Sequence, residues 1–267
     1  MENNVFHYFE NRVNKIIKGK RDYLTLISKT KEIGTYQIYN NDAKNIGLKN
    51  NSIDMVFTDF PYGDTVPYFE QSQLWNSWLK NKVDYKNEIV ISNSEERRKG
   101  KKEFEIDIES SINEIVRVLK NDHYFIFTYH SLDGNEWMAI NNAITKNSLV
   151  FQDCKLMLQK TFTPRQLNRK ITIKGDMIVI YKKNKNKKIR SGRIEFKDLK
   201  DINLIISNEL KKDCNIKDKY TTNDLISKCV KILLKQEHIT NNVNFKDIIE
   251  ENFYIGNENL WRLKWII

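Results

Sequence analysis

The sequence has few cysteines, and their spacing does not suit a metal site or a disulfide framework. Cys154, Cys214 and Cys229 are far apart, and no CxxC pair occurs. Structural zinc sites and small secreted domains both need closely and regularly spaced cysteines. We therefore expect neither a metal ion nor a disulfide scaffold, and the pattern fits the reducing cytoplasm.

Long apolar runs are also absent. No run approaches the roughly 18 residues that a membrane helix needs, and the N-terminus lacks the apolar core of a signal peptide. Hydrophobic residues make up 40% of the 267 residues and aromatic residues 11%, which is typical of a globular chain. The composition predicts a cytoplasmic enzyme or binding protein with no membrane partner.

Glycines are scarce and widely spread. The closest two of the nine glycines, Gly34 and Gly47, are 13 residues apart. No glycine-rich turn of the GxGxxG kind exists in any register, although such turns let a backbone approach a cofactor closely. This excludes a chain that holds a cofactor on such a turn by itself.

Prolines are scarcer still, and two of the three, Pro61 and Pro67, lie in one loop. This loop begins with Thr58-Asp59-Phe60-Pro61-Tyr62, directly after the apolar run Met55-Val56-Phe57. Ligands of open α/β sheets bind where strands end at their carboxyl side. An acid, a proline and an aromatic residue at that place predict a polar pocket with a wall on which a ring can stack.

The net charge of +10 is concentrated in one part of the chain. Residues 151 to 200 hold 15 Lys and Arg against 4 Asp and Glu. A block of one sign near a pocket loop indicates a polyanionic partner, here nucleic acid. The alternative is an ordinary solvated surface of a lysine-rich protein.

Hydrophobic periodicity predicts alternating helices and strands. Helices are expected at 5–29, 107–119 and around 137–144, and strands at 35–40, 53–58, 124–129, 149–158 and 177–181. This alternation favours an α/β protein with a mostly parallel sheet. After about residue 190 the pattern becomes helical, and Thr221 is a candidate N-cap. We therefore predict an N-terminal helical segment (1–34), a body (35–190) and a small helical appendage (191–267).

The loop after Phe57 resembles the Asp-Pro-Pro-Tyr motif of the amino-methyltransferases that modify adenine N6 or cytosine N4 in DNA. The resemblance continues through Tyr68 and Leu74-Trp75-Asn76-Ser77-Trp78-Leu79 to a family of bacterial adenine-specific DNA methylases, and it covers roughly residues 35 to 183. It implies a partial Rossmann-like class I methyltransferase sheet. It also implies transfer of a methyl group from S-adenosylmethionine to adenine N6 of a flipped DNA base.

The resemblance assigns roles to individual residues. Asp59 and the carbonyl of Phe60, next to Pro61, are expected to accept the amine hydrogens, and Tyr62 is expected to stack on the base. The cofactor is expected to contact Asp42, Ala43 and Asp59. For DNA, the expected contacts are Tyr68, which alternatively only packs, and the basic residues Arg165, Arg169, Lys170 and Lys174. Trp75 and Trp78 are expected in a core or interface, and His130 either lines the pocket or is a plain loop residue.

Two departures from the family pattern shape the functional hypotheses. Phe60 stands where the family has its first proline, and the family's glycine-rich cofactor turn has no counterpart. The first hypothesis is the C-terminal part of a split DNA methyltransferase, whose partner subunit carries the glycine-rich cofactor motif. The second is a non-catalytic nucleic-acid-binding or scaffold subunit. A third keeps the chemistry and moves the substrate to RNA.

Overall fold

The computed structural model describes residues 4–30, 34–64, 66–159, 173–187, 201–213, 219–236, 242–256, 258 and 260–264. The chain divides into two compact units, Met1–Asn40 and Asn41–Ile267. In the described residues no helix is long and apolar enough to cross a membrane, and no group of acidic, histidine or cysteine side chains could hold a metal ion.

The first unit contains one helix, α1 (Val5–Ser28), which confirms the helix predicted at 5–29. Asn4 caps it, because its side chain accepts a hydrogen bond from the backbone N–H of His7 at 3.1 Å. None of the residues of α1 is buried. The strand predicted at 35–40 is wrong, since residues 34–40 are irregular. Alternation alone does not make a strand where no described strand pairs with it.

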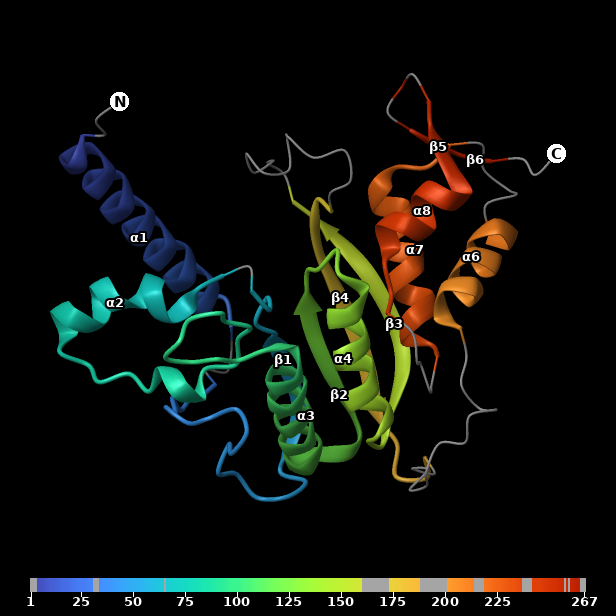
Figure 1. Cartoon of the computed structure of the whole chain (residues 1–267). Coiled ribbons are helices and arrows are strands. Elements are labelled where there is room, and N and C mark those ends of the chain that lie inside the picture. Colours follow the sequence, from blue (N-terminus) through green and yellow to red (C-terminus); the bar gives the residue numbers. More distant parts are fainter. Residues whose placement is uncertain are drawn as a thin grey trace. The chain divides into compact units, whose positions relative to one another are not determined.

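The second unit is built on a four-stranded sheet in the order β1-β2-β4-β3 (Figure 1). The strands are β1 (Ile53–Asp59), β2 (Leu119–Tyr129), β3 (Leu149–Leu158) and β4 (Gly175–Lys183). Only β1 and β2 pair in parallel, and β4 is antiparallel to both β2 and β3. The prediction of a mostly parallel sheet is therefore wrong. Strand β4 inserts between β2 and β3. An alternating pattern of helices and strands in the sequence does not reveal this insertion.

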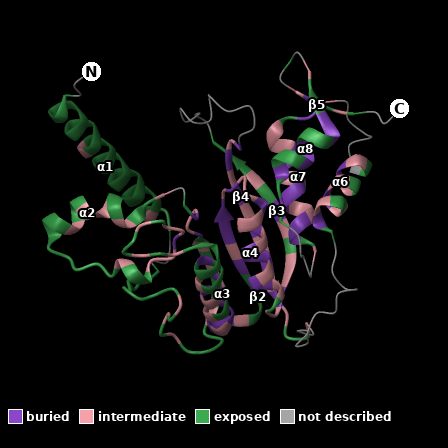
Figure 2. Cartoon of the chain, in the orientation of Figure 1, coloured by how far each residue is buried: buried purple, intermediate pink, exposed green. Residues whose placement is uncertain are grey.

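Two helices pack with one face of the sheet in a common core. They are α3 (Lys101–Val118), which links β1 to β2, and α4 (Gly134–Thr145), which links β2 to β3. The core includes Ile108, Ile112 and Trp137 from the helices and Phe125 and Phe127 from β2. The first strand is followed by α2 (Tyr68–Leu79) and a short 3-10 helix, η1 (Tyr85–Asn87), and most of α2 is exposed (Figure 2).

The C-terminal part is mainly helical, as predicted. It contains α6 (Ile202–Asp213), α7 (Thr222–Leu234), α8 (Phe245–Asn252) and a small hairpin of β5 (Phe253–Ile255) and β6 (Trp261–Leu263). Thr221 caps α7, and Asp224 completes its capping box. Helix α7 contacts β3 and α4, and its side chains belong to the same core as the sheet. The structure is thus an α/β protein with a helical C-terminal part, while the boundary near residue 190 stays a prediction.

Candidate functional site

The first strand places Asp59 at the carboxyl end of the parallel pair, directly beside Thr128 of β2. The hydroxyl of Thr128 donates a hydrogen bond of 2.6 Å to Asp59 Oδ1. The hydroxyl of Tyr62 lies 3.1 Å from Oδ1 and 3.3 Å from Oδ2 and donates to the same carboxylate. Two hydroxyl groups from different segments therefore fix the orientation of Asp59.

Phe60 is a core residue that anchors the loop. Only 4% of its surface is exposed, and its ring meets those of Phe125 and Phe127 edge to face, with centroids 6.2 and 5.1 Å away. Its backbone N–H donates to the Thr128 carbonyl at 3.3 Å, a bond that proline could not make. The departure from the family proline is thus accommodated by packing. Among described residues, none donates a backbone hydrogen bond to the Phe60 carbonyl outside the helices and strands.

Tyr62 lies between aromatic neighbours and carboxylates. Its ring stacks on Tyr129 with centroids 5.9 Å apart, and it meets His130 edge to face at 6.4 Å. Burial raises the pKa of the Tyr62 hydroxyl, and the negative charges of Asp176 and Asp59 raise it further. Tyr62 therefore stays a neutral hydrogen-bond donor at physiological pH.

The turn after Tyr62 packs against a partly buried carboxyl group. Gly63 has φ +50°, and a Cβ there would collide with the carboxylate of Glu136. Glu136 accepts a hydrogen bond of 2.8 Å from the hydroxyl of Tyr129. Burial raises the pKa of Glu136, although the hydrogen bonds from Ser131 and Tyr129 oppose this shift. The loop that carries Asp59 is therefore seated on α4.

The side chain of Tyr68, at the start of α2, contacts the loop that carries Asp59 and Tyr62. Burial raises the pKa of its hydroxyl, and a hydrogen bond with the backbone of Tyr62 partly opposes that effect. The structure thus places Tyr68 beside the motif. Further along α2, Trp75 and Trp78 are 64% and 82% exposed, so they are not core residues of this chain.

Asp42 and Ala43 lie in a turn that precedes β1. Asp42 Oδ1 accepts a hydrogen bond from the backbone N–H of Lys44 at 2.8 Å, as in an Asx turn. Lys44 in turn forms an ion pair of 3.0 Å with Asp107 of α3. No strand precedes Asp42, because the strand predicted at 35–40 does not form. A contact of Asp42 and Ala43 with a cofactor stays a prediction.

Of the basic residues predicted to bind DNA, Arg165, Arg169 and Lys170 lie outside the described residues. Lys174 is described and partly exposed, and its backbone N–H donates to Asn223 Oδ1 at 2.9 Å. The next residue, Gly175, has its carbonyl 2.6 Å from His130 Nδ1. Because His130 also meets Tyr62 edge to face, the start of β4 lies beside the motif loop. A role of His130 in a pocket stays a prediction.

Several residues of the site carried no predicted role: Thr128, Tyr129, Glu136 and Asp176. Thr128 could have been found from the sequence, since it lies near the carboxyl end of the strand expected at 124–129 and parallel strands end at one edge. Glu136 and Asp176 could not, because their positions depend on the seating of α4 and on the insertion of β4.

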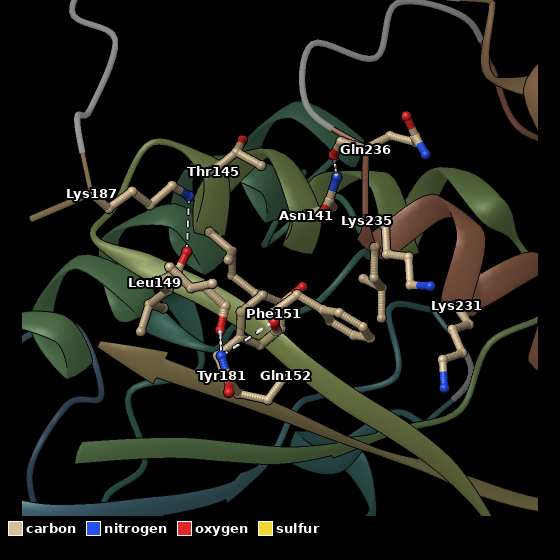
Figure 3. Close-up of a pocket in the computed structure, with 13 residues that line it drawn as sticks. Asn141, Thr145, Leu149, Phe151, Gln152, Tyr181, Lys187, Lys231, Lys235 and Gln236 are labelled. Carbon is tan, nitrogen blue, oxygen red and sulfur yellow. Dashed lines mark hydrogen bonds between the residues drawn. The ribbon is translucent and has the colours of Figure 1, made fainter. Parts of the chain in front are cut away.

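A separate cavity of about 590 Å³ lies at the opposite end of the sheet (Figure 3). It is lined by the last residues of α4 and α7, the start of β3 and Tyr181 of β4. Lys187 closes one side through a hydrogen bond of 2.8 Å to the Leu149 carbonyl. None of the residues predicted to act on a substrate lines this cavity, so it is distinct from the motif loop.

Comparisons with known proteins identify no family. No protein-family model matches the sequence, and no curated protein matches it. Two solved structures of TTHA0409 from Thermus thermophilus, a candidate DNA modification methylase, overlap with part of the chain at 11% identity and TM-scores of 0.32 and 0.33. They cover 58% and 59% of this chain, which spans 54% and 56% of the TTHA0409 chains. Similarity at this level carries no functional argument, so the function has to be inferred from the chain's own residues.

Proposed function

We propose that the chain is the base-binding subunit of an S-adenosylmethionine-dependent DNA methyltransferase that acts on adenine N6 of a flipped base. The observation that carries the proposal is the carboxylate of Asp59, held by Thr128 and Tyr62 at the carboxyl end of β1 within an Asp-Phe-Pro-Tyr sequence. The preference for adenine and for DNA comes from the resemblance in sequence.

In this proposal the residues of the motif loop accept hydrogen bonds from the target amine and orient it for methyl transfer. Adenine N6 is a weak nucleophile, because its lone pair is delocalised into the ring. Asp59 and the Phe60 carbonyl would accept its two hydrogens and favour a pyramidal nitrogen, which is electrostatic positioning with no covalent intermediate. Flipping a base costs a few kcal/mol, and stacking on an aromatic residue returns about 1–3 kcal/mol. Tyr62, with Tyr129 behind it, is the candidate platform.

The described residues do not form a complete site for S-adenosylmethionine. The motif loop offers acceptors for an amine, but the chain has no closely spaced glycines on which the methionine part could rest. When bound, the cofactor would supply the methyl group. A partner subunit with a glycine-rich strand–turn–helix would have to hold it, and the positive segment 151–200 would hold the DNA phosphates.

Methyl transfer to DNA tests the proposal. Tritium from S-adenosyl-[methyl-³H]methionine should enter DNA when the chain is purified together with its partner, and not when it is alone. Asp59→Asn should abolish incorporation in the complex, while Asp42→Asn, in the turn before β1, tests the predicted cofactor contact separately. Incorporation by the purified chain alone, or full activity of the Asp59→Asn complex, would contradict the proposal.

A scaffold that binds nucleic acid without catalysis is the second candidate. The missing glycine-rich turn favours it, and so does the Tyr62 hydroxyl, which occupies the acceptor oxygens of Asp59. A scaffold would keep DNA affinity and partner binding unchanged in the Asp59→Asn variant and would show no incorporation in any mixture.

A further inference from the structure

The cavity at the opposite end of the sheet from the motif loop is lined by positive side chains. Its volume of about 590 Å³ lies within the roughly 300–1,000 Å³ that small-molecule sites occupy. Lys187, Lys231 and Lys235 line it, and no described acidic residue does. Lys231 and Lys235 lie on one side of the cavity and Lys187 on the other (Figure 3). This distribution of charge suits a small anion.

The two lysines at the end of α7 differ in their partners. Lys231 forms an ion pair of 2.8 Å with Asp153. Lys235, the residue that follows the helix, forms no ion pair with a described residue and is exposed. A lysine binds a phosphate group as a compact charge with three hydrogen-bond donors. Lys235 is therefore available to an anion in the cavity, and Lys231 lies one helical turn before it.

Two polar atoms of the residues that line the cavity have no hydrogen-bond partner among the described residues. They are the hydroxyl of Tyr181 and Oδ1 of Asn141, whose residues are only 2% and 1% exposed. The other end of the Asn141 amide is paired, since Nδ2 donates to the Gln236 carbonyl at 2.8 Å. Buried polar groups are nearly always paired, because an unpaired one lowers stability. A bound molecule with polar groups would supply the missing partners.

The rest of the cavity wall is apolar and partly aromatic. Ile144, Leu149 and Leu234 line it, and the ring of Phe151 meets that of Tyr181 edge to face with centroids 5.6 Å apart. Phe151 is only partly buried, so a flat ring could pack on it. Burial raises the pKa of the Tyr181 hydroxyl, which therefore stays neutral and can donate or accept a hydrogen bond.

We infer that this cavity is a binding site for a small anion with a flat, hydrogen-bonding ring, of the class of the nucleoside phosphates. The phosphate group binds to Lys235 and Lys231, and the base packs on Phe151. The polar edge of the base donates to Asn141 Oδ1 and pairs with the hydroxyl of Tyr181. This site lies apart from the motif loop, so the inference goes beyond the proposed function and does not depend on it.

Simpler occupants would use only part of the cavity wall. An inorganic anion would pair with the lysines but would leave the apolar wall uncovered. A fatty acid would cover that wall, but its chain has no donor for Asn141 Oδ1. Water could bond to Asn141 and Tyr181, but it would not need a group of lysines.

Isothermal titration calorimetry of the full-length chain tests the site. The titrants are ribonucleoside 5′-monophosphates with each of the common bases, the matching nucleosides, and inorganic phosphate. At least one monophosphate should bind at a single site, at least about tenfold more tightly than its nucleoside or phosphate, because neither part alone uses the whole wall. Binding of no monophosphate, or equally tight binding of phosphate alone, would overturn the inference.

A matched pair of charge substitutions ties the binding to this cavity. K235E should weaken binding of the monophosphate at least about tenfold, because it replaces a phosphate-binding cation with an anion. K246E changes an exposed lysine of α8 that does not line the cavity, so it should leave the affinity unchanged. Equal losses in the two variants would mean that the nucleotide binds through the overall charge of the chain, which would overturn the inference.

The variant Y181F separates a ligand-binding role from a structural one. Because the hydroxyl of Tyr181 has no described partner, its removal should not lower the Tm of the ligand-free chain. It should nevertheless weaken binding of the monophosphate several-fold. A lower Tm together with an unchanged affinity would show that the hydroxyl serves the fold and not a ligand, and would count against the inference.

Discussion

The orientation of the Asp59 carboxylate depends on hydrogen bonds from two hydroxyl groups that differ in their mobility. Thr128 comes from the neighbouring strand, whose backbone is fixed by the ladder, whereas Tyr62 lies in the same loop as Asp59. Under the proposed function, the longer hydrogen bond from Tyr62 is the one that would give way when the amine of a base reaches the carboxylate. Thr128 would then keep Asp59 in place during the reaction.

Removal of the Thr128 hydroxyl should impair methyl transfer more than folding. A hydrogen bond to a charged group is worth about 1.5–3 kcal/mol, so T128V should lower kcat of the complex roughly 10- to 100-fold. T128S keeps the hydroxyl and should retain most of the activity, with KM for DNA little changed in both variants. Equal losses in T128V and T128S would contradict the role of the hydroxyl group, because serine keeps that hydroxyl and valine does not.

Glu136 makes stability depend on pH in an unusual direction. Its pKa is raised in the folded chain, mainly by burial, so folding favours the protonated form. The stabilisation is complete at low pH, below the ordinary pKa of glutamate, and is lost as pH rises through the raised pKa. Thermal unfolding of E136Q should therefore show a Tm gain over the native chain at pH 7 to 8.

That gain should disappear near pH 4, where both side chains are neutral. Glu114 provides the matched comparison, because its pKa is lowered, chiefly by the hydrogen bond with Arg117. E114Q should therefore show no Tm gain at neutral pH. A Tm difference for E136Q that stayed constant from pH 4 to 8 would contradict the role of ionisation.

Among the structural elements, the motif loop and α4 come close together at Gly63 and Glu136. Gly63 has a left-handed backbone conformation and sits where only hydrogen fits beside Glu136. G63A should destabilise the chain by at least about 1–2 kcal/mol, from the backbone conformation alone. The collision with Glu136 adds to that cost, so E136A should relieve part of it in the double variant, measured by urea unfolding.

Gly19 in α1 provides the control for this substitution. A Cβ at Gly19 meets nothing within 4 Å, and the residue lies inside a helix. G19A should leave the chain as stable as before or slightly more stable. A similar loss of stability in G19A and G63A would mean that the loss in G63A does not come from the backbone conformation of Gly63 or its contact with Glu136.

Some of the helices and strands could be predicted from the sequence, and others could not. The strand expected at 149–158 forms with those bounds, and Thr221 caps its helix as expected, because periodicity and capping are local properties. The orientation of β4 was missed, since antiparallel insertion depends on the competition among whole strands. Apolar and polar residues alternate over 35–40 as in a strand, but these residues are irregular. A strand also needs a neighbouring strand to pair with, and alternation does not show whether one is present.

In the candidate site, too, the residues that are close in sequence could be predicted, whereas those brought together by packing could not. Asp59, Tyr62 and Tyr68 do lie together, as the motif indicated, because they belong to one continuous loop and the helix after it. Glu136 and Asp176 come from segments far along the chain, and only the packed structure brings Asp176 near Tyr62 and Glu136 near Gly63. The contacts of Asp42, Ala43 and the basic residues with their ligands remain predictions.

The whole molecule divides into two compact units, Met1–Asn40 and Asn41–Ile267. None of the described residues of the first unit belongs to the buried core. Their removal should leave the main thermal transition of the chain within about 2 °C of its original Tm, as measured by calorimetry. Loss of the transition, or a much larger shift, would show that α1 stabilises the sheet.

The exposed apolar side chains of β1 and β2, namely Met55, Phe57 and Tyr124, have a consequence for the life of the chain in the cell. An unassembled subunit with exposed apolar strands is a ready substrate for chaperones and proteases, and at high concentration it aggregates. Under the proposed function, its abundance should therefore follow that of the partner subunit.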